Sequence, residues 1–175
     1  MSEVQSLIES VADARAKYLA EVKSLSPHQT THKVSDDIWN AIEITEHLYW
    51  VEQAGQVAIY KTIQAIAEGK TVWEGEHINK GLSIESIIER TWQPKEIAPA
   101  IVTPRLGGSI DLWTAYLKSL DIPLQALADK LKDTDLDILS FPNPVSGSFD
   151  IRHRLEFLRF HLNRHHKQVS ALKFN

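Results

Sequence analysis

Four long segments of this sequence repeat apolar residues at the spacing of an α-helix, and this pattern constrains the fold more than any other feature. The expected helices cover residues 2–25, 35–68, 109–132 and 150–172. The connection 70–108 contains one further short helix, expected over 83–92, and strand signals are weak apart from the β-branched run 100–103. The pattern predicts an all-α fold: one domain, residues 1–175, folded as a four-helix bundle with a long crossover connection between its second and third helices.

Capping and helix-breaking residues mark the ends of these helices. Residues that favour the N-cap position precede three of them: Ser2, Ser35 and Asp150. Gly69 is the predicted end of the second helix. Pro123 lies inside the third helical segment, where it removes a backbone hydrogen bond, so we expect a kink or a break near Asp121.

Composition excludes several classes of site and partner. The chain has 175 residues and no cysteine, which rules out disulfides, thiolate metal ligands and cysteine nucleophiles. Its net charge is −4 and no basic stripe stands out, so we expect no nucleic-acid partner. No apolar run approaches the roughly 20 residues of a membrane span, and the N-terminus lacks the apolar core of a signal peptide. A cytoplasmic protein with no membrane partner is the expectation.

His161 and His165 lie four residues apart on the last predicted helix. This spacing puts two side chains about 40° apart and one turn along, so both imidazoles can reach one ion. His165 belongs to the apolar stripe, and His161 borders it beside Leu158 and Leu162. An unpaired ring nitrogen in a dry interior costs about 1–3 kcal/mol, and a shared metal would satisfy both rings. The alternative is a pair on a solvated helix face, which binds nothing.

His47 is the best candidate for a third ligand. It adjoins Ile44 and Leu48 on the apolar stripe of the second predicted helix, which could place it opposite the histidine pair. A single interior histidine can also be an ordinary hydrogen-bonded core residue. With the pair at His161 and His165, His47 predicts a divalent metal held by three histidines.

The remaining five histidines are weaker candidates. His28 and His32 lie in a Pro- and Thr-rich stretch that we expect to be a loop. His77 lies in the long connection, where it could approach the mouth of a site. His153 and His166 are expected at the surface, because His153 is too far from His161 to share an ion with it and His166 points away from the pair.

Two polar residues could support the ligands by hydrogen bonding to their second ring nitrogens. Glu43 lies one turn before His47 and is a candidate hydrogen-bond partner or general base, although a solvated helix position is the alternative. Gln168 could accept a hydrogen bond from a ligand histidine or tie helix ends together.

These motifs resemble the DinB-like superfamily of metalloenzymes. Its last-helix signature, HxxRHxxQ, matches His161, Arg164, His165 and Gln168, and residues 39–48 are similar to its second-helix motif, in which a histidine precedes a leucine and an aromatic residue. The resemblance extends along nearly the whole chain and is closest to the shorter, uncharacterised branch. It implies a bundle with a long crossover, a homodimer, and a divalent zinc, nickel or iron ion on the three histidines.

The same resemblance suggests the chemistry. Characterised branches are thiol S-transferases that use bacillithiol or mycothiol, and maleylpyruvate isomerase. Three neutral imidazoles leave a coordination position open, which is typical of catalytic sites. The predicted function is therefore that of a metal-dependent enzyme that transfers a low-molecular-weight thiol to a small electrophilic substrate. The alternatives are a metal-dependent hydrolase, a non-catalytic metal-binding and stress-related dimer, or a bundle without metal.

Overall fold

The computed structural model describes residues 1–92 and 98–174 of the chain. In these ranges all regular secondary structure is helical, and the β-pairing consists of two isolated bridges, Leu139 with Asp150 and Asn143 with Gly147. The α-helices are α1 (Glu3–Lys23), α2 (Pro27–Thr31), α3 (Ala41–Ala67), α4 (Ile84–Thr91), α5 (Ile110–Ser119), α6 (Asp121–Gln125) and α7 (Ile151–Ala171). The 3-10 helices are η1 (Ala100–Val102), η2 (Asp133–Asp135) and η3 (Leu172–Phe174). The predicted all-α class is confirmed.

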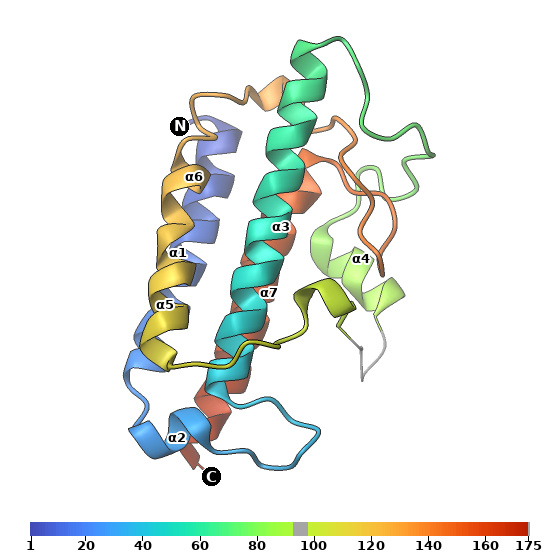
Figure 1. Cartoon of the computed structure of the whole chain (residues 1–175). Coiled ribbons are helices and arrows are strands. Elements are labelled where there is room, and N and C mark those ends of the chain that lie inside the picture. The colour runs from blue at the N-terminus through green and yellow to red at the C-terminus, as the bar shows by residue number, and fades with distance from the viewer. Residues whose placement is uncertain (93–97, 175) are drawn as a thin grey trace.

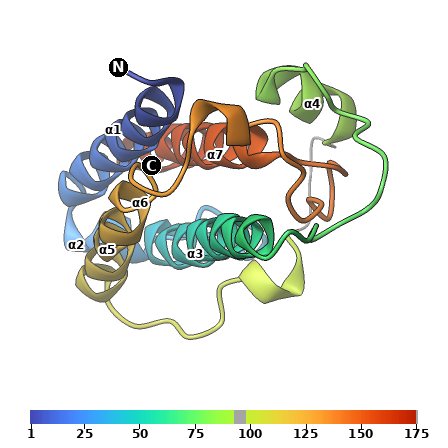
Figure 2. The same ribbon diagram turned by 90° about the horizontal axis from the view of Figure 1, so that it is seen from above.

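The long helices run alongside one another in two layers (Figure 1). Viewed from above, α1 and α7 form one layer, and α5 and α3 form the other (Figure 2). Helix α7 packs against both α1 and α3, and α3 also packs against α5. The short helix α4 lies outside these layers against α7. Among the described helices, none combines the length and the apolar content that a bilayer crossing requires.

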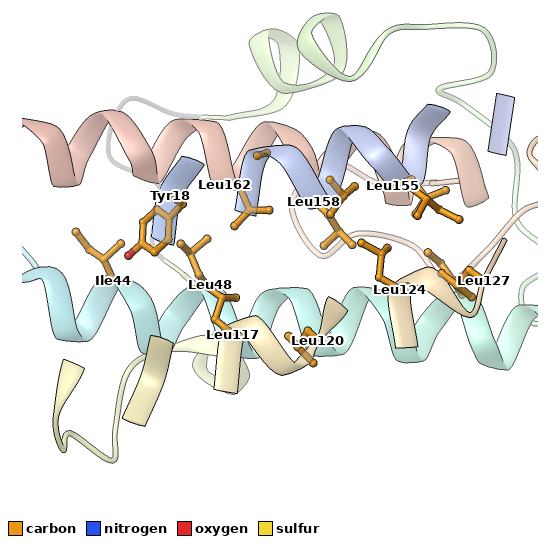
Figure 3. Close-up of a cluster of buried hydrophobic side chains, with 14 of the residues drawn as sticks. Tyr18, Ile44, Leu48, Leu117, Leu120, Leu124, Leu127, Leu155, Leu158 and Leu162 are labelled. Carbon is orange, nitrogen blue, oxygen red and sulfur yellow. The ribbon is translucent and has the colours of Figure 1, made fainter. Parts of the chain in front are cut away.

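The core lies between these layers and consists mainly of leucines (Figure 3). Leu158 and Leu162 of α7 meet Leu48 of α3, all almost fully buried. Burying a side chain of this size stabilises a fold by roughly 1.5–3 kcal/mol. The regular leucine spacing of the third predicted segment is also buried here, in Leu117, Leu120, Leu124 and Leu127.

Helix α3 begins later than the sequence predicts, and the predicted N-cap Ser35 is wrong. Asn40 is the N-cap, because its side-chain oxygen accepts a 2.9 Å hydrogen bond from the Glu43 amide, and Glu43 accepts one of 2.9 Å from the Asn40 amide. This reciprocal capping box satisfies two backbone donors, which a lone serine cannot do. The predicted end is confirmed: Gly69 has a φ of 67°, and the Lys70 amide donates back to the Ala65 carbonyl.

The break predicted near Asp121 is confirmed. Helix α5 ends at Ser119, and α6 begins at Asp121 with Leu120 between them. Pro123 has no amide hydrogen to donate, and its carbonyl accepts a 2.8 Å hydrogen bond from the Tyr60 hydroxyl of α3.

Two short segments differ from expectation. Residues 27–31, predicted as a loop, form α2, because Ser26 and Gln29 make a capping box and Pro27 occupies a position at the start of the helix where proline is favoured. The β-branched run 100–103 contains the 3-10 helix η1 rather than a strand. β-branched residues favour a strand mainly through packing against a neighbouring strand, and this run has no such neighbour among the described residues.

Helices α3 and α7 come close together at Gly55. A Cβ atom at this position would lie 2.9 Å from Cδ2 of Leu158. The missing side chain therefore lets the two helices that carry the predicted ligands approach each other.

Candidate metal centre

The three predicted histidines come together between α3 and α7. His47 projects from the second turn of α3, and His161 and His165 project from α7. The Nε2 atom of His161 lies 3.3 Å from Nε2 of His47 and 3.1 Å from Nε2 of His165. All three side chains are buried. The structure thus brings together three ring nitrogens that are distant in sequence.

Hydrogen bonds at the outer ring nitrogens determine which nitrogen of each ring carries the hydrogen. Nδ1 of His47 lies 2.8 Å from the Val102 carbonyl oxygen, and Nδ1 of His165 lies 2.6 Å from Oε1 of Gln168. Both oxygens accept, so each Nδ1 carries the hydrogen and each Nε2 presents a lone pair to the centre. The single ring hydrogen of a neutral His161 cannot satisfy both lone pairs well. An ion at the centre satisfies all three.

Burial keeps the three imidazoles neutral. It lowers the pKa of His47 to about 4 and that of His165 to about 3, and it holds the pKa of His161 well below its ordinary value. The neighbouring rings lower the pKa of His161 further, because each would repel a second positive charge. At neutral pH the lone pairs are therefore available to a metal.

The distances between the rings fit a divalent ion. Zinc binds imidazole nitrogen at about 2.0–2.1 Å in a tetrahedral arrangement, which separates the ligand atoms by about 3.4 Å. The Nε2 separations of 3.1 and 3.3 Å are close to this value. Nδ1 of His161, its outer ring nitrogen, is buried without a hydrogen-bond partner in the part of the chain that the structure describes, and an ion on Nε2 would not supply one. The three residues fit the metal in number, geometry and charge state.

Aromatic rings surround the histidines. Trp39 lies 4.9 Å from His47 between ring centroids, and Phe157 stacks on His161 at 5.4 Å. Trp92 makes a T-shaped contact with His161 at 6.3 Å between ring centroids, and the guanidinium of Arg164 lies over the Trp92 ring at 4.8 Å. These rings limit the access of water and strengthen any charge interaction at the centre.

Glu43 does not face the histidines. Its carboxylate caps α3 through the Asn40 amide and forms an ion pair of 2.7 Å with Lys33. The structure thus gives Glu43 a helix-capping contact, whereas Gln168 lies within hydrogen-bond distance of His165.

Glu46 is a buried carboxylate near the centre whose role the sequence pattern does not predict. It is fully buried, and its oxygens accept hydrogen bonds from the backbone amides of Arg105, Leu106 and Gly107 at 2.8, 2.9 and 3.1 Å. Burial opposes its charge, yet these donors lower its pKa below the ordinary value. Because it fixes the segment just after Val102, Glu46 also fixes the carbonyl that orients His47. Its position directly before a buried histidine was the available signal.

Replacing Glu46 with glutamine is expected to lower the free energy of unfolding by about 2 kcal/mol. A neutral amide accepts more weakly and presents an NH2 group to backbone donors. Urea denaturation measures the change. Glu43→Gln is the matched control, since glutamine also serves in a capping box, and we expect a change below about 1 kcal/mol. Equal effects of the two substitutions would contradict this role for Glu46.

A second histidine cluster lies at the start of α7. His153 was expected at the surface, and this prediction is wrong: its side chain is 1% exposed. It contacts Asp150, the N-cap of α7, and His77 lies on the other side of Asp150. The long connection returns over this end of α7 and covers it, which helical spacing alone does not indicate.

The chain matches one known protein family along most of its length. The sequence profile of the DinB superfamily matches residues 11–169, which includes all three histidines of the centre. The chain belongs to the DinB superfamily. Among curated proteins, none matches this DinB protein significantly.

Two solved structures share the fold of this DinB protein. One is the colibactin self-resistance protein ClbS in complex with a dsDNA, at a TM-score of 0.57 and 13% identity, covering 100% of this chain and 98% of that one. The other is a conserved protein from Enterococcus faecalis, at a TM-score of 0.55 and 12% identity, covering 99% and 96%. At these identities the likeness concerns the fold.

The ClbS complex corrects one expectation. The absence of a nucleic-acid partner was predicted from the net charge of −4 and the lack of a basic stripe. A protein of the same fold is bound to double-stranded DNA, so that exclusion is wrong. Net charge describes the average field of a protein, whereas DNA contacts depend on local cations and backbone donors.

Proposed function

We propose that this DinB protein binds one divalent ion, zinc, nickel or iron, through Nε2 of His47, His161 and His165 and acts as a metal-dependent enzyme. The observation that carries the proposal is the convergence of the three Nε2 atoms, with the hydrogens of His47 and His165 held on the outside by Val102 and Gln168. Such orientation of ligands by outer hydrogen bonds is typical of metal sites.

Three neutral protein ligands leave at least one position for water or substrate. When bound, the ion supplies Lewis acidity, which lowers the pKa of a bound water or thiol. The chain itself supplies the orientation of the rings and the aromatic wall formed by Trp39, Trp92 and Phe157. Arg164, over the face of Trp92, is the nearby cation that could meet an anionic substrate.

Transfer of a low-molecular-weight thiol to a small electrophile is the reaction we favour. The chain contains no cysteine, so the thiol must be a separate small molecule. The family resemblance supports this choice. Metal-dependent hydrolysis is the alternative reaction, and a non-catalytic, stress-related metal-binding dimer is the alternative role. We also propose that the protein is cytoplasmic and homodimeric, and that its long helices form a single four-helix bundle domain.

Metal analysis and turnover test the proposal together. We expect His161→Ala to lose one equivalent of bound metal and to abolish transfer of a small thiol to a model electrophile. His28→Ala, which removes an exposed histidine of α2, is the matched control and should retain both. Hydrolysis of an ester without thiol would select the hydrolase. Unchanged metal content in His161→Ala would refute the site, and loss of metal without loss of any reaction would support the non-catalytic role.

Duplex DNA contact is a second candidate function, favoured by the ClbS complex. Arg164 and Lys167 on α7 are the cations to test, because neither forms an ion pair with an acidic residue within the described ranges. We expect a labelled duplex to bind with an affinity that falls as salt rises, and the Arg164→Ala, Lys167→Ala double variant to bind more weakly. Anisotropy that stays flat at low salt would exclude this function.

A further inference from the structure

The second cluster joins residues from two separate segments. His77 comes from the connection after α3, and Asp150 and His153 come from the first turn of α7. Nε2 of His77 lies 3.3 Å from Oδ2 of Asp150, and Nδ1 of His153 lies 3.0 Å from Oδ1 of the same carboxylate. Two imidazoles therefore approach the two oxygens of one buried carboxylate from different sides.

The hydrogen bonds of His153 leave its Nδ1 atom close to a second acceptor, the Asp150 carboxylate. Nε2 of His153 lies 3.0 Å from the Leu82 carbonyl oxygen, which can only accept, so Nε2 carries the hydrogen. In a neutral ring Nδ1 is then a lone pair that accepts a long hydrogen bond of 3.5 Å from the Asp150 amide. It also faces Oδ1 of Asp150, which already accepts a 2.7 Å hydrogen bond from the His153 amide. Two acceptors 3.0 Å apart require a positive species between or beside them.

His77 supplies an independent observation. Its Nε2 atom is buried and has no hydrogen-bond partner in the described structure, although Oδ2 of Asp150 is only 3.3 Å away. The contact is close in distance but falls outside hydrogen-bond geometry. A buried ring nitrogen left in this state costs free energy, and a ligand between it and the carboxylate removes that cost.

We propose that His77, Asp150 and His153 form a second divalent-metal site. Two imidazole nitrogens and one carboxylate oxygen are a ligand set that zinc accepts, and three protein ligands leave a position for water. The ligand atoms all lie within 4.8 Å of one another. The carboxylate also offsets part of the ion's charge, which the three-histidine centre cannot do.

An adjoining cavity gives the ion a route to the site. The cavity has a volume of about 350 Å³ and is lined by Asp150 and His153 together with residues of the 80–83 segment. Its walls also include Asp137, which pairs with Arg152 at 3.2 Å, and Lys80, so the route is polar but not acidic. An entry path is one of the features that a real metal site needs.

The two sites are separate. His153 precedes His161 by eight residues on α7, which corresponds to about 12 Å along a helix. No single ion spans that distance, so the second site can be studied after the first has been removed. Its rival occupant is a proton, since protonated His153 would also pair with Asp150.

Cobalt titration in a variant that lacks the first site distinguishes the ion from the proton. In His47→Ala, His161→Ala protein we expect one equivalent of Co²⁺ to bind and to produce the visible absorption of a low-coordinate site. Adding His77→Ala should weaken this binding at least tenfold. His77 lies in a loop and caps no helix, so the fold should remain, which circular dichroism checks. His28→Ala, added instead, is the control and should leave the titration unchanged.

Nitrogen NMR of the His153 ring provides a second measurement that does not depend on the His77 variant. In the His47→Ala, His161→Ala background, we use Zn²⁺ in place of Co²⁺. Zinc binding should shift the nitrogen resonance of Nδ1 of His153 and leave Nε2 protonated. Absence of cobalt binding, or two protonated ring nitrogens that zinc does not change, would overturn the proposal. Because the background lacks the three-histidine centre, this result is independent of the proposed function.

Discussion

Replacing Glu52 with alanine is expected to lower the free energy of unfolding by about 3–5 kcal/mol. Glu52 of α3 pairs with Arg15 of α1, and both side chains are almost fully buried. Nε of Arg15 donates to both carboxylate oxygens, at 3.0 and 3.2 Å, and Gln56 donates to one of them. Without Glu52, the Arg15 guanidinium keeps one acidic partner among the described residues, Asp121, which is half exposed. A buried charge left with so little compensation is costly.

Urea denaturation of Glu52→Ala measures this effect, with Glu3→Ala as the matched control. Glu3 pairs with Arg152 at the surface, and exposed pairs contribute about 0–1 kcal/mol. The double variant Arg15→Leu, Glu52→Leu should recover most of the loss, because it removes both charges and fills the space with apolar groups. Similar losses in Glu52→Ala and Glu3→Ala would contradict this prediction, because breaking the buried pair would then cost no more than breaking the exposed one.

Acid should destabilise the metal-free protein strongly between about pH 6.5 and pH 4. Burial lowers the pKa of His47 from 6.5 to about 4, so in this window the unfolded chain binds a proton that the folded chain does not. Stability therefore falls as the pH falls, by about 3 kcal/mol from His47 alone, and the loss levels off below the folded pKa. His165, with a pKa of about 3, extends the effect to lower pH.

Chelator-treated protein unfolded in urea at several pH values tests this dependence. His47→Leu should reduce the slope, whereas His28→Ala should not. His153 acts in the opposite direction. Burial lowers its pKa, but the hydrogen bond and charge of Asp150 help to outweigh burial and the pKa is raised overall. Its contribution is therefore present below 6.5 and is lost as the pH rises through its folded pKa. Identical slopes in the wild type and His47→Leu would contradict neutral, buried histidines in the folded state.

Much of the helix plan follows from the sequence, because it depends on local signals. Ser2 and Asp150 cap helices where expected, Gly69 ends α3, and Pro123 accompanies the break before α6. Apolar spacing also predicted that His165 faces inward. The start of α3 was misplaced because two adequate N-caps, Ser35 and Asn40, compete, and only Asn40 has a glutamate three residues later.

The second cluster and the role of Glu46 could not be predicted from spacing. Both depend on how the long connection folds back, over α7 in one case and against α3 in the other. His153 looks like a surface residue on an isolated helix, and Leu82, which covers it, is 71 positions away. Helical periodicity assigns a residue to a face, but it does not say which loop covers that face.

Gly55 has a consequence for how metal preference could change in evolution. The distance between α3 and α7 sets the span between His47 and the pair on α7, and at Gly55 that distance depends on a missing methyl group facing Leu158. Movement of the Leu158 side chain can admit a methyl group here, whereas a bulkier residue would wedge the helices apart and widen the span between the histidines. Under the proposed metal role, selection for an ion of different radius would therefore act on core volume, at a residue two turns beyond His47, while His47, His161 and His165 stay the same.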